Sequence, residues 1–112
     1  MLDLSKLEAL KLPEKEIEIS IMGHPQKVTI SAYGDDISLQ VADINANRPD
    51  DGELRIRKLL LTSCVKGMDE KSADLLLRKA GKEVRIILNE IFDLNEQFDE
   101  ERNRIRGQAE KN

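Results

Sequence analysis

The segment KEVRIILNEIFDLNEQF (residues 82–98) is the last apolar run of the chain and predicts an amphipathic helix. Its large apolar side chains recur every three or four residues, which places them on one face of a helix. The stripe that they form consists of Val84, Ile87, Leu88, Ile91, Leu94 and Phe98. A stripe of this kind either packs into a core or docks on another polypeptide.

The stripe carries more apolar residues than a domain of this size can cover. We therefore expect its distal part to bind a protein partner, because an amphipathic helix in a groove is a common mode of recognition. The residues predicted to bind are Leu88, Ile91, Leu94 and Phe98. The alternative is that they pack inside the domain or on a second copy of the chain, which would make the protein a homo-oligomer.

Beyond Phe98 the composition changes to mostly charged residues, and Ile105 is the one large apolar side chain before the end. Helix propensity alone must hold such a segment, and isolated helices are marginal in water. We therefore expect a single domain over residues 1–98, followed by a charged, frayed tail over residues 99–112.

Two shorter runs near the start alternate apolar and polar residues with the period of a half-buried strand. Their apolar residues are Ile17, Ile19 and Ile21 in the first run, and Val28, Ile30 and Ala32 in the second. The Gly- and Pro-containing segment 23–26 between them predicts the turn of a β-hairpin. A lone hairpin is barely stable in water, so its apolar face must pack on the helices.

Three more helices are expected between the hairpin and residue 82. The first has Asp35 or Asp36 as its N-cap and stops near Asn47, ahead of Pro49. The second covers residues 52–66, with Asp50 as its N-cap. Its apolar stripe is so wide that we expect this helix to be the central one, packed on several sides.

Gly67 and Asp69 predict the end of that helix and the N-cap of a third, which ends at Gly81. At the N-terminus, Ser5–Glu8 has the spacing of a capping box and predicts a helical turn. The predicted fold class is α+β, with an N-terminal β-hairpin packed on a bundle of about four helices.

Composition limits the classes of function. The formal net charge of −4 argues against non-specific nucleic-acid binding and against an anionic membrane surface. No run reaches the roughly 18 apolar residues of a membrane span, and the N-terminus lacks the basic region of a signal peptide. The single cysteine, Cys64, fits a reducing compartment, so we expect a cytoplasmic protein.

No catalytic, cofactor or metal motif is apparent, and we expect the protein not to be an enzyme. His24 stands in the hairpin turn without a neighbour suited to a triad or a metal site. Cys64 lies on an apolar helix face without an adjacent base, which is typical of a packed thiol. The acidic pairs at 35–36 and 50–51 precede predicted helices, where Asp is a preferred N-cap residue, so capping explains them without catalysis.

The alternative function is DNA binding by a small regulator or antitoxin. Residues 52–66, the turn at 67–69 and residues 70–80 have the layout of a helix-turn-helix. The second of these helices offers Arg78 and Lys79 but also carries acidic residues, so its positive charge is low for gripping phosphates.

The order of elements resembles a known family. The strand pair returning from Gly23 to Val28 is followed by LRIRKLLLTSCVKGMDEKSADLLLRKAG (residues 54–81), KEVRIILNEIFDL (residues 82–94) and a charged tail. Over roughly residues 15–98 this layout resembles the small tail assembly chaperones of long-tailed bacteriophages. The resemblance implies a non-enzymatic protein of the host cytoplasm that binds the tape-measure protein and aids the assembly of tail-tube subunits.

Overall fold

A β-hairpin is followed by four helices in the part of the chain that the structure, a computed structural model, describes: residues 4–5 and 11–110. The elements are β1 (Glu14–Ile21), β2 (His24–Ser31), α2 (Asp35–Asn47), α3 (Gly52–Cys64), α4 (Glu70–Lys79) and α5 (Gly81–Glu110). The predicted α+β architecture is confirmed. The helical turn predicted at Ser5–Glu8 lies mostly outside the described residues.

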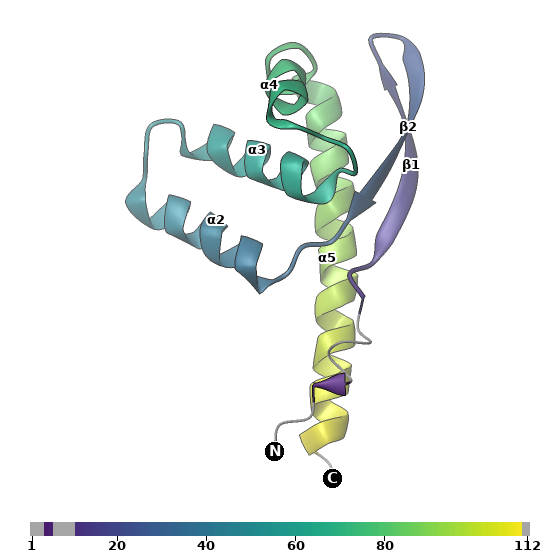
Figure 1. Ribbon diagram of the computed structural model, residues 1–112, viewed down its shortest axis with the longest axis vertical. Helices are drawn as coiled ribbons and strands as arrows, with labels where there is room; N and C mark the ends of the chain where they lie inside the picture. The colour runs from purple at the N-terminus through teal and green to yellow at the C-terminus, as the bar shows by residue number, and fades with distance from the viewer. Residues whose placement is uncertain (1–3, 6–10, 111–112) are drawn as a thin grey trace.

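Helix α5 is the element on which the others assemble (Figure 1). Its 30 residues span about 45 Å and run along the longest dimension of the molecule, 52 Å. Both strands, α3 and α4 contact α5. The helix beginning near residue 52 does pack on several sides, as predicted, since α3 contacts α2, α4 and α5, but α5 contacts more elements and contributes more of the buried core. Leu54, in the first turn of α3, is 53% exposed.

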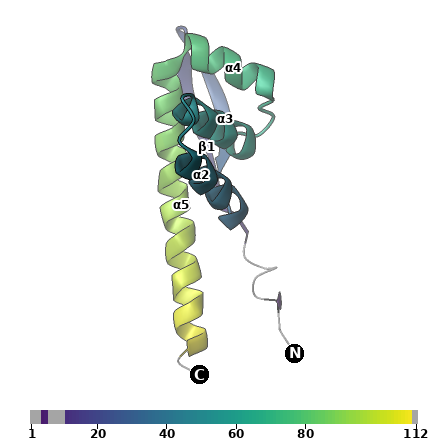
Figure 2. The same ribbon diagram turned by 90° about the vertical axis from the view of Figure 1, so that its left-hand side faces the viewer.

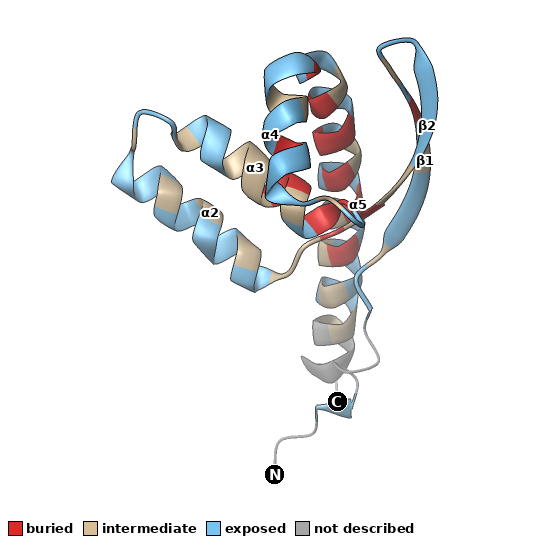
Figure 3. Ribbon diagram, turned by 45° about the horizontal axis from the view of Figure 1, so that its top comes forward, coloured by how far each residue is buried: buried red, intermediate tan, exposed pale blue. Residues whose placement is uncertain are grey.

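The apolar stripe of residues 84–98 faces the interior along its whole length (Figure 3). Leu88, Ile91, Leu94 and Phe98, which were predicted to bind a partner, are at most 7% exposed. The expectation of an exposed patch at these positions is wrong, because the hairpin, α3 and α4 together cover this face of α5. Within a single copy of the chain these four residues are core.

The hairpin pairs Ile17 with Val28 and closes with Ile21 opposite His24. The turn therefore has two residues, Met22 and Gly23, and the four-residue turn predicted at 23–26 is wrong. Both turn residues have positive φ, 54° and 82°, as in the type I′ turns that match the twist of paired strands. Gly23 adopts this conformation without strain, whereas Met22 does so at a steric cost.

Several polar contacts fix the hairpin to the helices. Lys15 on β1 forms an ion pair with Glu90 on α5, at 2.9 Å. The outer edge of β2 is partly covered by the segment after α3, because the backbone amide of Lys66 donates to the carbonyl oxygen of Thr29. The connection that leads into α2 is held by α5, because the backbone amide of Tyr33 donates to Oδ1 of Asn95 at 3.0 Å.

The helix ends differ in detail from the predicted caps. Asp69 is the N-cap of α4, as predicted, and its Oδ1 accepts a hydrogen bond from the backbone amide of Ser72 (2.7 Å). The N-cap of α3 is Asp51, not Asp50. The N-cap of α2 is Gly34, so Asp35 and Asp36 lie inside the first turn of the helix. There their negative charges interact favourably with the positive end of the helix dipole and stabilise the helix.

The predicted boundary at residue 98 does not appear as a break in the helix, because α5 continues to Glu110. One residue beyond the boundary is part of the packing. The guanidinium group of Arg102 lies 4.9 Å from the centre of the Phe98 ring and donates to Asp35 at 2.8 Å and to Asp99. These hydrogen bonds raise the pKa of Arg102, and they connect α5 with the start of α2.

Candidate protein-binding cleft

An open cleft of about 570 Å³ lies between α3, α5 and the C-terminal end of α2. Its position follows from the arrangement of the helices: α2 and α3 form an arm that leads away from the hairpin in Figure 1, while Figure 2 shows the arm and the hairpin on the same side of α5. The residues that line it are Ile44, Asn45, Arg48, Pro49, Gly52, Glu53, Ile56, Arg57, Leu60, Arg85, Leu88, Asn89 and Phe92.

Helical spacing brings these side chains together. Ile56 and Leu60 are four residues apart on one face of α3, and Leu88 and Phe92 have the same spacing on α5. Ile44, in the last turn of α2, completes the apolar lining. The floor of the cleft is thus apolar and belongs to three helices.

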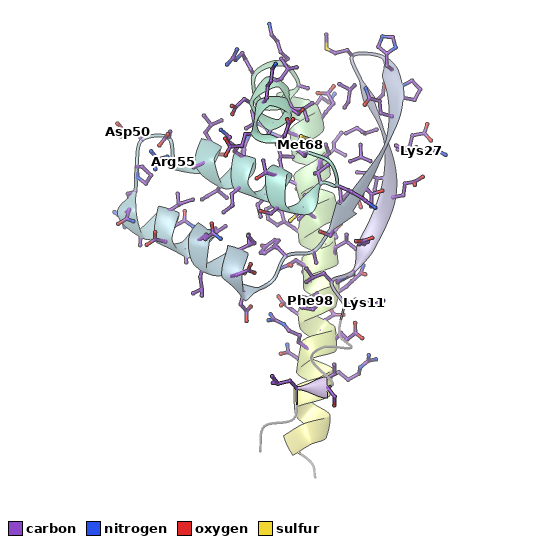
Figure 4. The ribbon with its side chains drawn as sticks, viewed as in Figure 1. Lys11, Lys27, Asp50, Arg55, Met68 and Phe98 are labelled. Carbon is purple, nitrogen blue, oxygen red and sulfur yellow. The ribbon has the colours of Figure 1, made fainter. Side chains whose placement is uncertain are left out.

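Helix α2 is loosely attached, and this leaves the cleft open. None of its residues is fully buried, and its main packing partner is α3. The predicted stripe of Ile37, Val41 and Ile44 is present, but each of these residues is only half-buried. The far end of the α2–α3 arm, marked by Asp50 and Arg55 in Figure 4, points away from α5.

Phe92 is the large aromatic residue of the cleft, and it is 42% exposed. The apolar stripe predicted from the sequence does not include Phe92, because this residue follows Ile91 and lies just off the buried face of the helix. A signal was nevertheless present: Phe92 is one of three aromatic residues in the whole chain. Leu54, also exposed, lines an adjoining depression that shares Glu53, Arg57 and Arg85 with the cleft.

Three arginines surround the apolar floor, whereas Glu53 is the single carboxylate in the lining. Arg57 forms an ion pair with Glu53 at 2.5 Å. The side chains of Arg48 and Arg85 form no ion pair or hydrogen bond with the described residues. The cleft is therefore cationic, although the chain as a whole carries a net charge of −4.

A second depression of about 450 Å³ lies between β2 and α4. Its apolar lining includes Met68, which Figure 4 shows near the inner side of α4, and the exposed residue Leu75. Lys27 and Lys66 are its cationic residues. This depression contains neither an aromatic residue nor an arginine, the types that most often dominate binding energy at interfaces.

The residues considered for chemistry stand apart from one another. His24 is exposed at the first position of β2, whereas Cys64 is 2% exposed in the core. Burial raises the pKa of the Cys64 thiol to about 11, so the thiol is protonated at neutral pH. Burial likewise raises the pKa of Tyr33, whose backbone amide donates to Oδ1 of Asn95 on α5. Cys64 and Tyr33 thus have packing roles.

The two helices of the suggested helix-turn-helix are present and in contact, joined by a turn in which Gly67 has a φ of 79°. The N-terminal end of α4, which would have to approach DNA, carries Asp69 and Glu70. Its basic residues, Arg78 and Lys79, lie in the last turn. This distribution places negative charge at the end of the helix that reads DNA.

Among residues 4–5 and 11–110, no three His, Cys, Asp or Glu side chains are grouped as metal ligands would be. Within the same part of the chain, every helix is too short or too polar to cross a lipid bilayer. Comparisons with protein-family models, with curated proteins and with solved structures found no match to this chain. The resemblance to tail assembly chaperones therefore rests on the order of the elements, the size of the chain and its charge balance.

Proposed function

We propose that this protein is a non-enzymatic assembly chaperone that binds a segment of another polypeptide in the cleft between α2, α3 and α5. The observation that carries this proposal is the half-exposed Phe92 beside an apolar floor and an arginine rim. Aromatic and arginine side chains around a concave apolar surface are the usual composition of an interaction hot spot.

The resemblance of the chain to phage tail assembly chaperones indicates which partner to test first. The tape-measure protein of such a phage is the expected ligand, and the tail-tube subunits would be the proteins whose assembly is aided. The host cytoplasm is the compartment in which such binding would occur. Of the four α5 residues first predicted to bind, Leu88 lines the floor of the cleft, whereas Ile91, Leu94 and Phe98 are buried in the core and are not part of this proposal.

Two matched variants test the proposal. Phe92→Asp places a charge in the cleft, whereas Ile86→Asp makes the same change on the same helix at a residue that is 45% exposed and lines none of the depressions described. Each variant is expressed in tagged form together with the proteins encoded beside it, and the retained polypeptides are identified by mass spectrometry. Circular dichroism reports whether each variant is folded.

We expect the wild type and Ile86→Asp to retain a long helical partner, and Phe92→Asp to lose it while keeping its helical signal. Each buried apolar contact at an interface contributes about 1.5–3 kcal/mol, so a charge at the centre of the cleft should abolish stable capture. Equal retention by both folded variants would exclude the cleft as the binding site.

DNA binding remains the competing prediction, and it has a direct test. A regulator that uses α4 must bind duplex DNA at low salt and must lose affinity when Arg78 and Lys79 are both changed to Glu. The acidic N-terminus of α4 leads us to expect no shift of duplex DNA in a gel, even at low ionic strength.

A further inference from the structure

We infer that the occupant of the cleft is an amphipathic helix whose apolar stripe is flanked by acidic side chains. This inference rests on the proposed function, since it specifies the chemistry of the segment bound at the same site. It follows from two properties of the lining: the state of its backbone groups and the distribution of its charges.

The apolar floor of the cleft has no free backbone groups that could form hydrogen bonds with an extended peptide. Every lining residue belongs to α2, α3, α5 or the short connection between α2 and α3. Ile56, Leu60, Leu88 and Phe92 of the floor lie inside α3 and α5, where the backbone amides and carbonyls are paired within the helix, and no strand of the hairpin lines the cleft. A segment that leaves water here must pair its own backbone groups, and a helix does so.

The charges of the lining determine which side chains should flank the apolar stripe of the bound helix. Arg48 and Arg85 reach the cleft from different elements, since Arg48 follows the end of α2 and Arg85 lies on α5. Neither guanidinium group has an ion partner among the described residues, and Arg57 shares its charge with Glu53 alone. A docked helix with carboxylates on both sides of its apolar stripe would neutralise both free arginines, often through bidentate contacts.

Other occupants fit the cleft less well. The C-terminal part of α5 cannot fold back into it, because residues 81–110 form one continuous helix that itself lines the site. A basic helix would face three arginines. A second copy of this chain is the remaining occupant, and the oligomeric state of the protein distinguishes it from a different partner.

The test is a selection with defined probes. A library of helical peptides with a fixed leucine stripe and flanking positions randomised among Glu, Lys and Ser is displayed on yeast and sorted against the full-length protein. The enriched peptides are then measured against Phe92→Asp, against the charge reversal Arg48→Glu with Arg85→Glu, and against Arg78→Glu with Lys79→Glu. The last variant reverses two charges on α4, outside the cleft.

We expect the enriched peptides to be rich in Glu at the flanks and to lose binding to Phe92→Asp. The charge reversal at Arg48 and Arg85 should lower the affinity of these peptides by about tenfold or more, because two exposed ion pairs are lost and two repulsions are gained. Peptides with Lys at the flanks should then bind the reversed protein better than the wild type. The α4 variant should bind like the wild type.

Three results would overturn the inference. Enriched helices that depend on Phe92 but show no preference for Glu would remove the acidic requirement, while the cleft would stand as a binding site. Failure to enrich any Phe92-dependent helix would remove the helical occupant, and the capture experiment would still judge the proposed function separately. Sedimentation showing a dimer that Phe92→Asp dissociates would identify a second copy as the occupant.

Discussion

Ile91 and Phe92 are neighbours in the chain with opposite environments, since Ile91 is 0% exposed and Phe92 is 42% exposed. Ile91→Ala should lower the free energy of unfolding by about 2–5 kcal/mol, because it opens a cavity in the core. Phe92→Ala should cost only about 1 kcal/mol, since half of its ring is already in water. Urea denaturation of both variants measures the difference. Similar losses at the two positions would contradict the burial pattern.

Asp69 gives a pH-dependent prediction. The backbone amide of Ser72 donates to its carboxylate and lowers the pKa of Asp69 below its ordinary value of 3.8. The cap therefore stabilises the protein fully above pH 3.8, and this contribution is lost as the pH falls through the depressed pKa of the folded state.

Asp69→Ala should consequently be less stable than the wild type at pH 7. The difference in melting temperature between the two proteins should become smaller as the pH falls. Thermal melts of both proteins between pH 7 and pH 2.5 follow this difference. Asp36→Ala is the control: Asp36 lies in the first turn of α2 and accepts no capping hydrogen bond. A gap that stays constant with pH at Asp69 would contradict the role of the charged cap.

At the scale of single residues, the sequence predicted which side chains share one face of α5 but not which of them are exposed to solvent. Periodicity places Leu94 and Phe98 on one face, yet the same pattern describes a docking helix and a core helix. The choice depends on elements distant in the chain, because the hairpin covers the face that residues 84–98 present. Phe92 was missed for the complementary reason, since it lies beside the stripe and its neighbours come from α2 and α3.

The turn of the hairpin gives a prediction at the scale of the element. Met22 is 74% exposed and has a φ of 54°, a conformation that costs most residues about 1–2 kcal/mol. Asn tolerates this region, and Asn-Gly is a favoured type I′ pair. Met22→Asn should therefore raise the free energy of unfolding by about 1 kcal/mol, as measured in urea. Destabilisation would show that the Met22 side chain makes a contact worth more than the strain.

The end of α5 gives a second prediction at this scale. Arg102→Ala removes the cation over the Phe98 ring and the contact with Asp35, so it should lower stability by about 1 kcal/mol. Arg104→Ala is the matched control, because the ion pair that Arg104 forms with a described residue is a long one, 3.6 Å to Glu101, and its side chain is largely exposed. Urea titrations that find equal effects would show that α5 has no packing role beyond Phe98.

The sequence predicted which helices and strands exist better than it predicted where they end and which helix is central to the packing. Alternation and helical periodicity are local signals, so the two strands and the four helices of the described chain were expected at nearly their observed positions. The turn was misplaced because Met22 carries none of the composition of a turn. Helix 52–66 was thought central because its apolar stripe is wide, yet part of that stripe, including Leu54, lines a surface depression.

At the scale of the whole molecule, stability should be distributed unevenly. The buried residues lie between the hairpin, α3, α4 and α5, whereas α2 contributes none (Figure 3). Amides of α2 should therefore exchange with deuterium faster than those of residues 84–98, because local opening of α2 breaks few apolar contacts. Hydrogen exchange with mass spectrometry tests this order, and equal protection of α2 and the middle of α5 would contradict it.

Because α2 has no buried residue and packs mainly on α3, the two walls of the cleft differ in how firmly they are held. One wall, α5, is rigidly built into the core, and the other ends in Arg48, on a helix fixed mainly to its neighbour α3. If the cleft binds a helix as proposed, this difference between its walls would allow it to accept helices of different diameter without disturbing the packing behind α5. Binding would then have to order α2, and this loss of conformational entropy would weaken the complex. A weaker complex would allow the bound helix to be released after assembly.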